Sequence, residues 1–115
     1  MALRFKNWLF GVDRPRFPAA TPDQLEGLRA RRFSHATPER FAALWCEIAN
    51  ICGVDPLRLN ESDEIAELCP SQGALDLNLR IMELEALVAM ESKGMPPPAI
   101  RPQTIGDIID YLTGR

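Results

Sequence analysis

The chain has 115 residues, of which 46% are hydrophobic and 25% charged, and this composition is typical of a single globular domain. No apolar run approaches the roughly 18 residues that cross a bilayer, so we expect no transmembrane segment. The first residues lack the pattern of a secretory signal, and three cysteines cannot all pair within one chain, so we expect a cytoplasmic location.

The charges are unevenly distributed along the chain. Residues 1–38 carry seven basic and three acidic side chains, a net charge of +4, whereas residues 39–115 carry six basic and thirteen acidic ones, a net charge of −7. A basic segment on an acidic body predicts that the segment folds back onto the body or reaches an acidic partner. The acidic body also argues against nucleic-acid binding.

The N-terminal segment combines its basic residues with aromatic ones. Phe5, Trp8 and Leu9 lie near helical spacing and are the expected anchors of an N-terminal arm. Burying such side chains contributes on the order of 1.5–3 kcal/mol each, which would hold the arm against an apolar surface. One alternative is a segment that contacts a membrane surface or a partner protein, since basic and aromatic residues suit both. The other is a mobile terminus with scattered apolar residues.

Two helices are predicted by their capping residues. Thr21 followed by Pro22 marks the start of a short helix over about 22–31, and Thr37 followed by Pro38 marks the start of a longer one. The longer helix is expected to end at Gly53. Its apolar residues recur at helical spacing: Phe41, Leu44, Trp45, Ile48 and Cys52.

The segment after this helix is expected to be a loop. Val54-Asp55-Pro56 turns the chain, and we expect both Leu57 and Leu59 to pack onto the core from the loop. Residues 62–68 are predicted to add a short helical turn.

A long helix is predicted from about residue 74 to residue 92, and Gly94 with Pro96-Pro97-Pro98 ends it. At about 100° per residue its apolar side chains form two stripes: Leu77, Ile81, Leu84 and Val88 in the first, and Leu75, Leu79, Met82 and Ala86 in the second. A polar sector lies opposite, away from the expected core: Asp76, Arg80, Glu83 and Glu91. Because a helix in a small bundle needs one apolar face, we expect the N-terminal arm to cover the second stripe, within one chain or swapped between two.

The last predicted helix begins with a capping box, formed by Thr104 and Asp107, in which Asp replaces the usual Glu or Gln. One apolar side follows, made by Ile105, Ile108, Ile109 and Leu112. No segment alternates like a β-strand, so the sequence predicts an all-α fold.

Several stretches in this order resemble the acyl carrier protein family. The first long helix ends in Gly53-Val54-Asp55-Pro56, Gly73-Ala74-Leu75-Asp76-Leu77 is similar to the family's Asp-Ser-Leu-Asp-Leu signature, and residues 104–112 are similar to its last helix. The resemblance covers about residues 38–112 and implies a small acyl-carrier-like four-helix bundle. The implied organisation is an N-terminal extension over 1–36 and a helical domain over 37–115.

The signature departs from the family at the modified position. In carriers the signature serine bears phosphopantetheine, because its hydroxyl oxygen attacks the pyrophosphate of coenzyme A. Ala74 has a methyl group at this position and Gly73 replaces the preceding Asp, so we expect no prosthetic group and no other cofactor. The alternative is a genuine acyl or peptidyl carrier, modified at the nearby hydroxyl of Ser71, in fatty-acid, polyketide or related biosynthesis.

The resemblance also implies a partner-binding face on the long helix. The positions that carriers show to their partner enzymes are Leu75, Asn78, Leu79, Met82, Glu85 and Ala86. Carriers commonly have acidic residues along this face, whereas Leu79 and Ala86 make it apolar here. We therefore expect a non-catalytic interaction module that binds another protein, or a second copy of itself, through this helix or the arm.

No catalytic or metal site is predicted. His35 has no obvious acid beside it, and Cys46, Cys52 and Cys69 lack the CxxC spacing of zinc sites, so buried cysteine is the expected role. The sequence has no phosphate-binding glycine loop and no nucleophile elbow. We therefore do not expect an enzyme.

Overall fold

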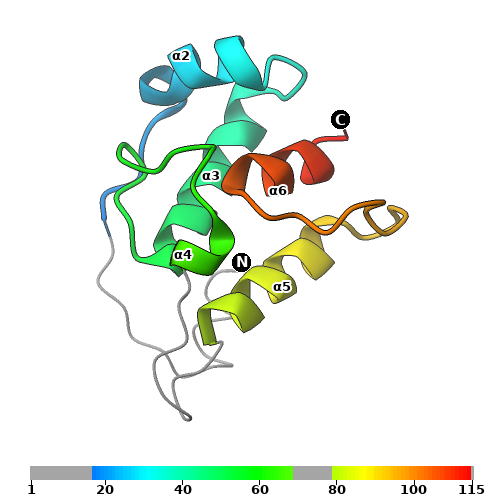
Figure 1. Ribbon diagram of the computed structural model, residues 1–115. Coiled ribbons are helices and arrows are strands. Elements are labelled where there is room, and N and C mark those ends of the chain that lie inside the picture. Colours follow the sequence, from blue (N-terminus) through cyan, green and yellow to red (C-terminus); the bar gives the residue numbers. More distant parts are fainter. Residues whose placement is uncertain (1–16, 69–78, 115) are drawn as a thin grey trace.

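The computed structural model describes residues 17–68 and 79–114, with side chains in the second stretch from Arg80 onward. Within these ranges lie five helices: α2 (Pro22–Arg32), α3 (Pro38–Cys52), α4 (Ile65–Leu68), α5 (Leu79–Glu91) and α6 (Ile105–Leu112) (Figure 1). The same ranges contain no β-strand, so the predicted all-α fold is confirmed for the described part of the chain. No helix in it is both long and apolar enough to span a bilayer.

The central helix α3 has the bounds that its capping residues predict. The Thr37 side chain accepts a hydrogen bond from the backbone N–H of Arg40, and Gly53 ends the helix with a φ of 72°. Glycine adopts this left-handed conformation without the strain that a Cβ would add. The predicted apolar face is buried, since each of its members is at most 2% exposed: Phe41, Leu44, Trp45, Ile48 and Cys52.

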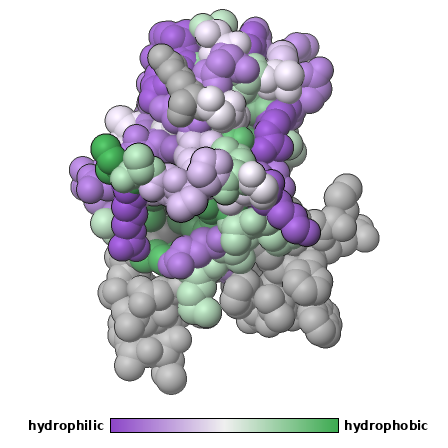
Figure 2. All heavy atoms as spheres, turned by 90° about the vertical axis from the view of Figure 1, so that its right-hand side faces the viewer, coloured by the Kyte–Doolittle hydropathy of each residue, from purple (hydrophilic) through white to green (hydrophobic). Residues whose placement is uncertain are grey.

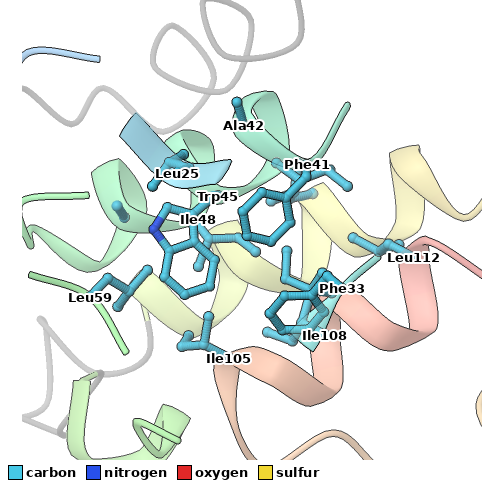
Figure 3. Close-up of a cluster of buried hydrophobic side chains, with 14 of the residues drawn as sticks. Leu25, Phe33, Phe41, Ala42, Trp45, Ile48, Leu59, Ile105, Ile108 and Leu112 are labelled. Atoms are coloured by element: carbon cyan, nitrogen blue, oxygen red, sulfur yellow. The ribbon is translucent and has the colours of Figure 1, made fainter. Parts of the chain in front are cut away.

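An aromatic stack forms the middle of the core (Figure 3). The ring centroids of Phe33 and Phe41 are 5.2 Å apart, and those of Phe41 and Trp45 are 5.4 Å apart. The Trp45 indole N–H donates to the Pro56 carbonyl oxygen at 2.8 Å, so its polar group has a partner inside the core. Aliphatic side chains from the surrounding elements close this core: Leu25, Leu59, Ile105, Ile109 and Leu112.

α2 packs on α3 and is tied to α6 by an ion pair. The Arg32 guanidinium donates two hydrogen bonds to the Asp110 carboxylate, at 3.1 and 2.7 Å, and lies 4.7 Å from the centroid of the Phe33 ring. Just beyond α2, the Nε2 atom of His35 lies 2.6 Å from the Thr113 hydroxyl. The short helix of the predicted N-terminal extension therefore packs directly on the predicted helical domain.

Of the two leucines in the loop after α3, only one packs onto the core. Leu59 is 5% exposed, as expected, but Leu57 is 56% exposed, so the prediction that Leu57 packs onto the core is wrong. Asp55 explains the difference, because its backbone carbonyl accepts from the N–H groups of Arg58 and Leu59 and its carboxylate accepts from the N–H of Leu57. This tight turn sends successive side chains in different directions, and only one of them reaches the core.

α5 buries a different side from the one that the sequence predicts. Its most buried residues are Glu83, Leu84 and Leu87, at 2%, 4% and 0% exposed. The expectation that Glu83 belongs to a polar sector away from the core is therefore wrong. Leu87 belongs to neither predicted stripe, yet it is the most buried residue of the three.

Polar contacts at both ends of α5 accompany this orientation. At the first turn, Nη1 of Arg80 donates to the Leu68 carbonyl oxygen at 3.1 Å, and the guanidinium lies against Gly53 at the end of α3. At the last turn, Glu91 accepts from Arg40 of α3 at 3.3 Å. Because Arg80 bonds to the end of α4 while lying against Gly53, and Glu91 bonds to α3 itself, the predicted polar side of α5 can face α3.

α6 begins with the predicted capping box. The Thr104 hydroxyl accepts from the Asp107 N–H at 3.1 Å, and the Asp107 carboxylate accepts from the N–H groups of Gln103 and Thr104 at 3.0 and 3.1 Å. These hydrogen bonds, the one from Gln103 foremost, hold the pKa of Asp107 below its ordinary value. The predicted apolar side of the helix is buried throughout: Ile105, Ile108, Ile109 and Leu112.

Replacing Asp107 by Asn should remove the acid sensitivity of this cap. A carboxylate whose folded-state pKa is depressed stabilises the fold above its unfolded pKa of about 3.9, and this contribution is lost as the pH falls through the lower folded pKa. We expect D107N to be less stable than the wild type by about 0.5–1 kcal/mol at neutral pH. In urea unfolding at a series of pH values, this difference should shrink below about pH 3.9; a constant difference would contradict the role of the carboxylate.

Candidate interaction groove

A groove of about 790 Å³ runs along α5 on the side that faces α6. Its walls come from the α4 region, α5, α6 and residues 92–103. Figure 2 views the molecule from this side, and hydrophobic side chains, in green, gather between hydrophilic ones in its lower half. This volume falls within the range of about 300–1,000 Å³ that is usual for ligand pockets.

Two helices supply the apolar side walls. On α5 the lining residues are Ile81, Leu84 and Val88, and on α6 they are Ile108 and Tyr111. Leu84 is buried, whereas Ile81 and Val88 are half-buried and remain accessible from the groove. In the first predicted stripe, Leu84 therefore packs into the core, whereas Ile81 and Val88 line the groove.

The proline-rich segment between α5 and α6 forms a further wall, to which Pro97 and Pro98 contribute. The Tyr111 hydroxyl donates to the Pro96 carbonyl oxygen at 2.7 Å, so α6 holds the proline run directly. At the end of the segment, the Gln103 carbonyl accepts from the N–H of Ile65 at 2.9 Å. Because proline fixes φ, few conformations are available to this wall.

Replacing Tyr111 by Phe should loosen the proline wall while keeping the aromatic ring. The Pro96 carbonyl loses its donor, so we expect the free energy of unfolding to fall by about 0.5–1.5 kcal/mol. Hydrogen exchange of peptides covering residues 92–104, measured by mass spectrometry, should become faster than in the wild type. Unchanged exchange in this segment would show that the hydroxyl does not hold the wall.

The charged lining of the groove is mainly acidic. Among the described lining residues, Glu64 and Glu85 are acidic and Arg101 is basic. Glu64, Glu85 and Arg101 are all exposed, so water solvates these charges in the open groove. The arrangement suits a ligand that combines apolar side chains with positive charge.

The outer face of α5 carries the described part of the predicted partner-binding face. Met82 is 47% exposed and Ala86 is half-buried on this face, whereas Glu85 is exposed on the side of α5 that lines the groove. Met90, which is 42% exposed, extends this face beyond Ala86 by about one helical turn. The remaining predicted positions lie outside the described residues or side chains: Leu75, Asn78 and Leu79.

Several other predicted sites also fall outside the described residues. They are the attachment position Ala74 with its neighbour Gly73, the fallback hydroxyl Ser71, and the arm anchors Phe5, Trp8 and Leu9. The expected absence of a prosthetic group and the expected docking of the arm therefore stay predictions.

The groove itself was not predicted from the sequence. Its walls meet because residues 61–65 lie beside residues 103–106: the Asp63 carbonyl accepts from the N–H of Ile105 at 3.0 Å, and the Glu61 carbonyl accepts from the N–H of Gly106 at 2.8 Å. A Cβ on Gly106 would lie 3.0 Å from the Glu61 oxygen, so the close approach favours glycine there. The only local signal was the proline run, which predicts the end of a helix but not the position of a wall.

The described thiols are shielded to different degrees. Cys52 is 1% exposed, whereas Cys46 is half-buried and its thiol donates to the Ala20 carbonyl at 3.5 Å. Burial raises the pKa of the Cys46 thiol, which lowers its reactivity at neutral pH. Cys69 lies outside the described residues. Within the described ranges, no three His, Cys, Asp or Glu side chains are grouped as metal ligands would be.

Within the described part of the chain, a function can thus be based on the groove and on the outer face of α5. No protein-family model, no curated protein and no solved structure matches this chain.

Proposed function

We propose that this chain is an acyl-carrier-like protein that lacks the phosphopantetheine serine and acts by binding another protein. The proposal rests on Ala74. This residue directly precedes Leu75-Asp76-Leu77 and occupies the position at which carriers have the attachment serine. A methyl group cannot attack coenzyme A, so a protein with this fold would carry no covalently attached acyl group. The activity that we propose for it is therefore the binding of another protein.

The order and contacts of the helices support an acyl-carrier-like bundle. α3 packs against both α5 and α6, and α5 packs against α6. The short α4 lies between α3 and α5 in the chain and, with these three helices, makes up the proposed four-helix bundle. α2 packs on α3 in addition to this set.

The outer face of α5 supports a protein partner. Met82 and Met90 are exposed along one side of the helix, with the small Ala86 between them. Methionine side chains are flexible and polarisable, so they adapt to apolar partner surfaces. An apolar helix face of this kind fits an interaction through burial of surface area rather than through ion pairs.

Incubation of the full chain with coenzyme A and a promiscuous phosphopantetheinyl transferase tests the proposal. Intact-mass spectrometry should show no mass gain, while an authentic carrier protein in the same mixture should be fully modified. A mass gain that maps to Ser71 and disappears in S71A would instead establish the alternative, a genuine acyl or peptidyl carrier. The measurement therefore decides between the two functions without knowledge of the partner.

A further inference from the structure

We propose that the groove between α5, α6 and the proline-rich segment is the docking site of this chain's own N-terminal arm, residues 1–16. The described walls of the groove are apolar and their charges sum to −1. Residues 1–16 carry four basic side chains and one acidic one, a net charge of +3, together with the apolar anchors Phe5, Trp8 and Leu9. The arm and the groove are thus complementary in both hydrophobicity and charge.

The arm joins the described chain near the C-terminal end of α3, which adjoins the first turn of α5. Phe17, the first described residue, borders a shallow hollow together with Asn50 and Val54 at the end of α3. Gly53, next to Val54, lies against the guanidinium of Arg80 in the first turn of α5. The next residue of α5, Ile81, lines the groove. A short path therefore leads from the start of the described chain, past the end of α3, to the beginning of the groove.

The arm is long enough to follow this path. Eight residues separate Leu9 from Phe17 and twelve separate Phe5 from it, and chains of these lengths span up to about 28 and 40 Å. The longest dimension of the molecule is 40 Å. With the arm fully extended, Phe5 can therefore reach the groove of the same chain, so docking within one chain needs no second copy.

Charge complementarity sets the orientation of the arm. Arg4 and Lys6 flank the anchor Phe5 in the sequence, and Glu64 and Glu85 line the groove. Ion pairs at such an exposed position direct the arm but contribute little free energy, whereas burial of the aromatic anchors contributes most of it. Docking should accordingly persist in salt, with a moderately lower occupancy.

The groove suits the arm better than the outer face of α5 does. A side chain in the groove contacts α5 on one side and α6 or the proline-rich segment on the other, so more of its apolar surface leaves water. On the outer face, Met82, Ala86 and Met90 belong to a single helix and offer a convex surface. We therefore place the arm on the side of α5 opposite to the face that the sequence predicts it to cover.

Photo-crosslinking of the full chain tests this placement. A photoreactive benzoylphenylalanine replaces Trp8, and peptide mapping after irradiation identifies its neighbours. We expect adducts on the groove-lining residues Ile81, Val88 and Tyr111. Adducts confined to the outer face around Met82 and Met90, adducts elsewhere, or no adducts would overturn the proposal. In a mixture of isotope-labelled and unlabelled chains, adducts between the two kinds of chain would also overturn it.

Two matched variants of the crosslinking chain provide the control. Glu85 and Met82 are both exposed residues of α5, one lining the groove and the other on the outer face. E85K should lower the groove adducts moderately at low salt, because it reverses a charge that directs the arm, and M82K should leave them unchanged. The opposite result would place the arm on the outer face. The experiment needs neither a partner nor a transferase, so its outcome is independent of the function proposed above.

Discussion

Replacing Trp45 by Ala is expected to lower the free energy of unfolding by about 3–5 kcal/mol. The Trp45 side chain is fully buried and stacks on Phe41, and its indole N–H is the donor for the Pro56 carbonyl. The substitution leaves a large cavity and an unsatisfied carbonyl at the same point of the core. Since small domains are stable by about 5–15 kcal/mol, the loss is a large fraction of the total.

Thermal unfolding followed by circular dichroism measures this effect. A loss of this size corresponds to a drop in Tm of about 10–20 °C for a domain of this length. W45F should be intermediate, because it keeps an aromatic ring but not the N–H donor. L57A is the surface control and should stay within about 0.5 kcal/mol of the wild type, since Leu57 is 56% exposed. Equal effects of W45A and L57A would show that the aromatic stack does not support the core.

Restoring the missing signature should turn the chain into a substrate of a phosphopantetheinyl transferase. In the double variant G73D/A74S, residues 73–77 become Asp-Ser-Leu-Asp-Leu, which supplies both the hydroxyl nucleophile and the acid that precedes it in carriers. We expect intact-mass spectrometry to show one added phosphopantetheine, mapped to position 74, where the wild type shows none. The change is from no product to a modified protein, which makes it the largest functional effect we predict.

The matched control separates the restored serine from the neighbouring one. G73D/A74S carrying S71A in addition should be modified to the same extent, whereas G73D alone should remain unmodified. An unmodified G73D/A74S protein would mean that this segment does not present a hydroxyl as carriers do. That result would contradict the acyl-carrier-like resemblance on which the proposed function rests.

The ends of the helices could be predicted because their signals are local. Thr37 and Gly53 bound α3, and Thr104 with Asp107 begins α6, as their sequence positions indicate. Each signal depends on a hydrogen bond or a backbone angle within a few residues of the helix end. The buried faces of α3 and α6 followed from the same local information, because each helix has a single apolar side.

The orientation of α5 could not be predicted in this way. Leu87 is buried, Val88 lines the groove and Met82 is exposed, so apolar residues occur on several sides of this helix. Helical periodicity identifies the stripes but not the one that meets the core. That choice depends on tertiary contacts, such as the burial of Leu84 and Leu87 and the contacts of Arg80 with Leu68 and of Glu91 with Arg40.

The candidate surfaces were predictable to different extents. The outer face of α5 followed from the acyl-carrier-like register, which places Met82, Glu85 and Ala86 together. The groove did not, because one wall is the proline-rich segment, whose position depends on the bond between the Tyr111 hydroxyl and the Pro96 carbonyl. A surface that depends on contacts between residues far apart in the chain, such as Tyr111 with Pro96 and Ile65 with Gln103, leaves no periodic pattern in the sequence.

The ion pair and the hydrogen bond that join the end of α2 to the end of α6 have a consequence for the biosynthesis of the protein. Arg32 and His35 find their partners in Asp110 and Thr113, each 78 residues later in the chain. At about 5–20 residues per second, a ribosome needs roughly 4–16 s to synthesise the intervening residues. During this interval the nascent N-terminal helix lacks its counter-ion on α6, so its final docking must follow translation of the C-terminal helix.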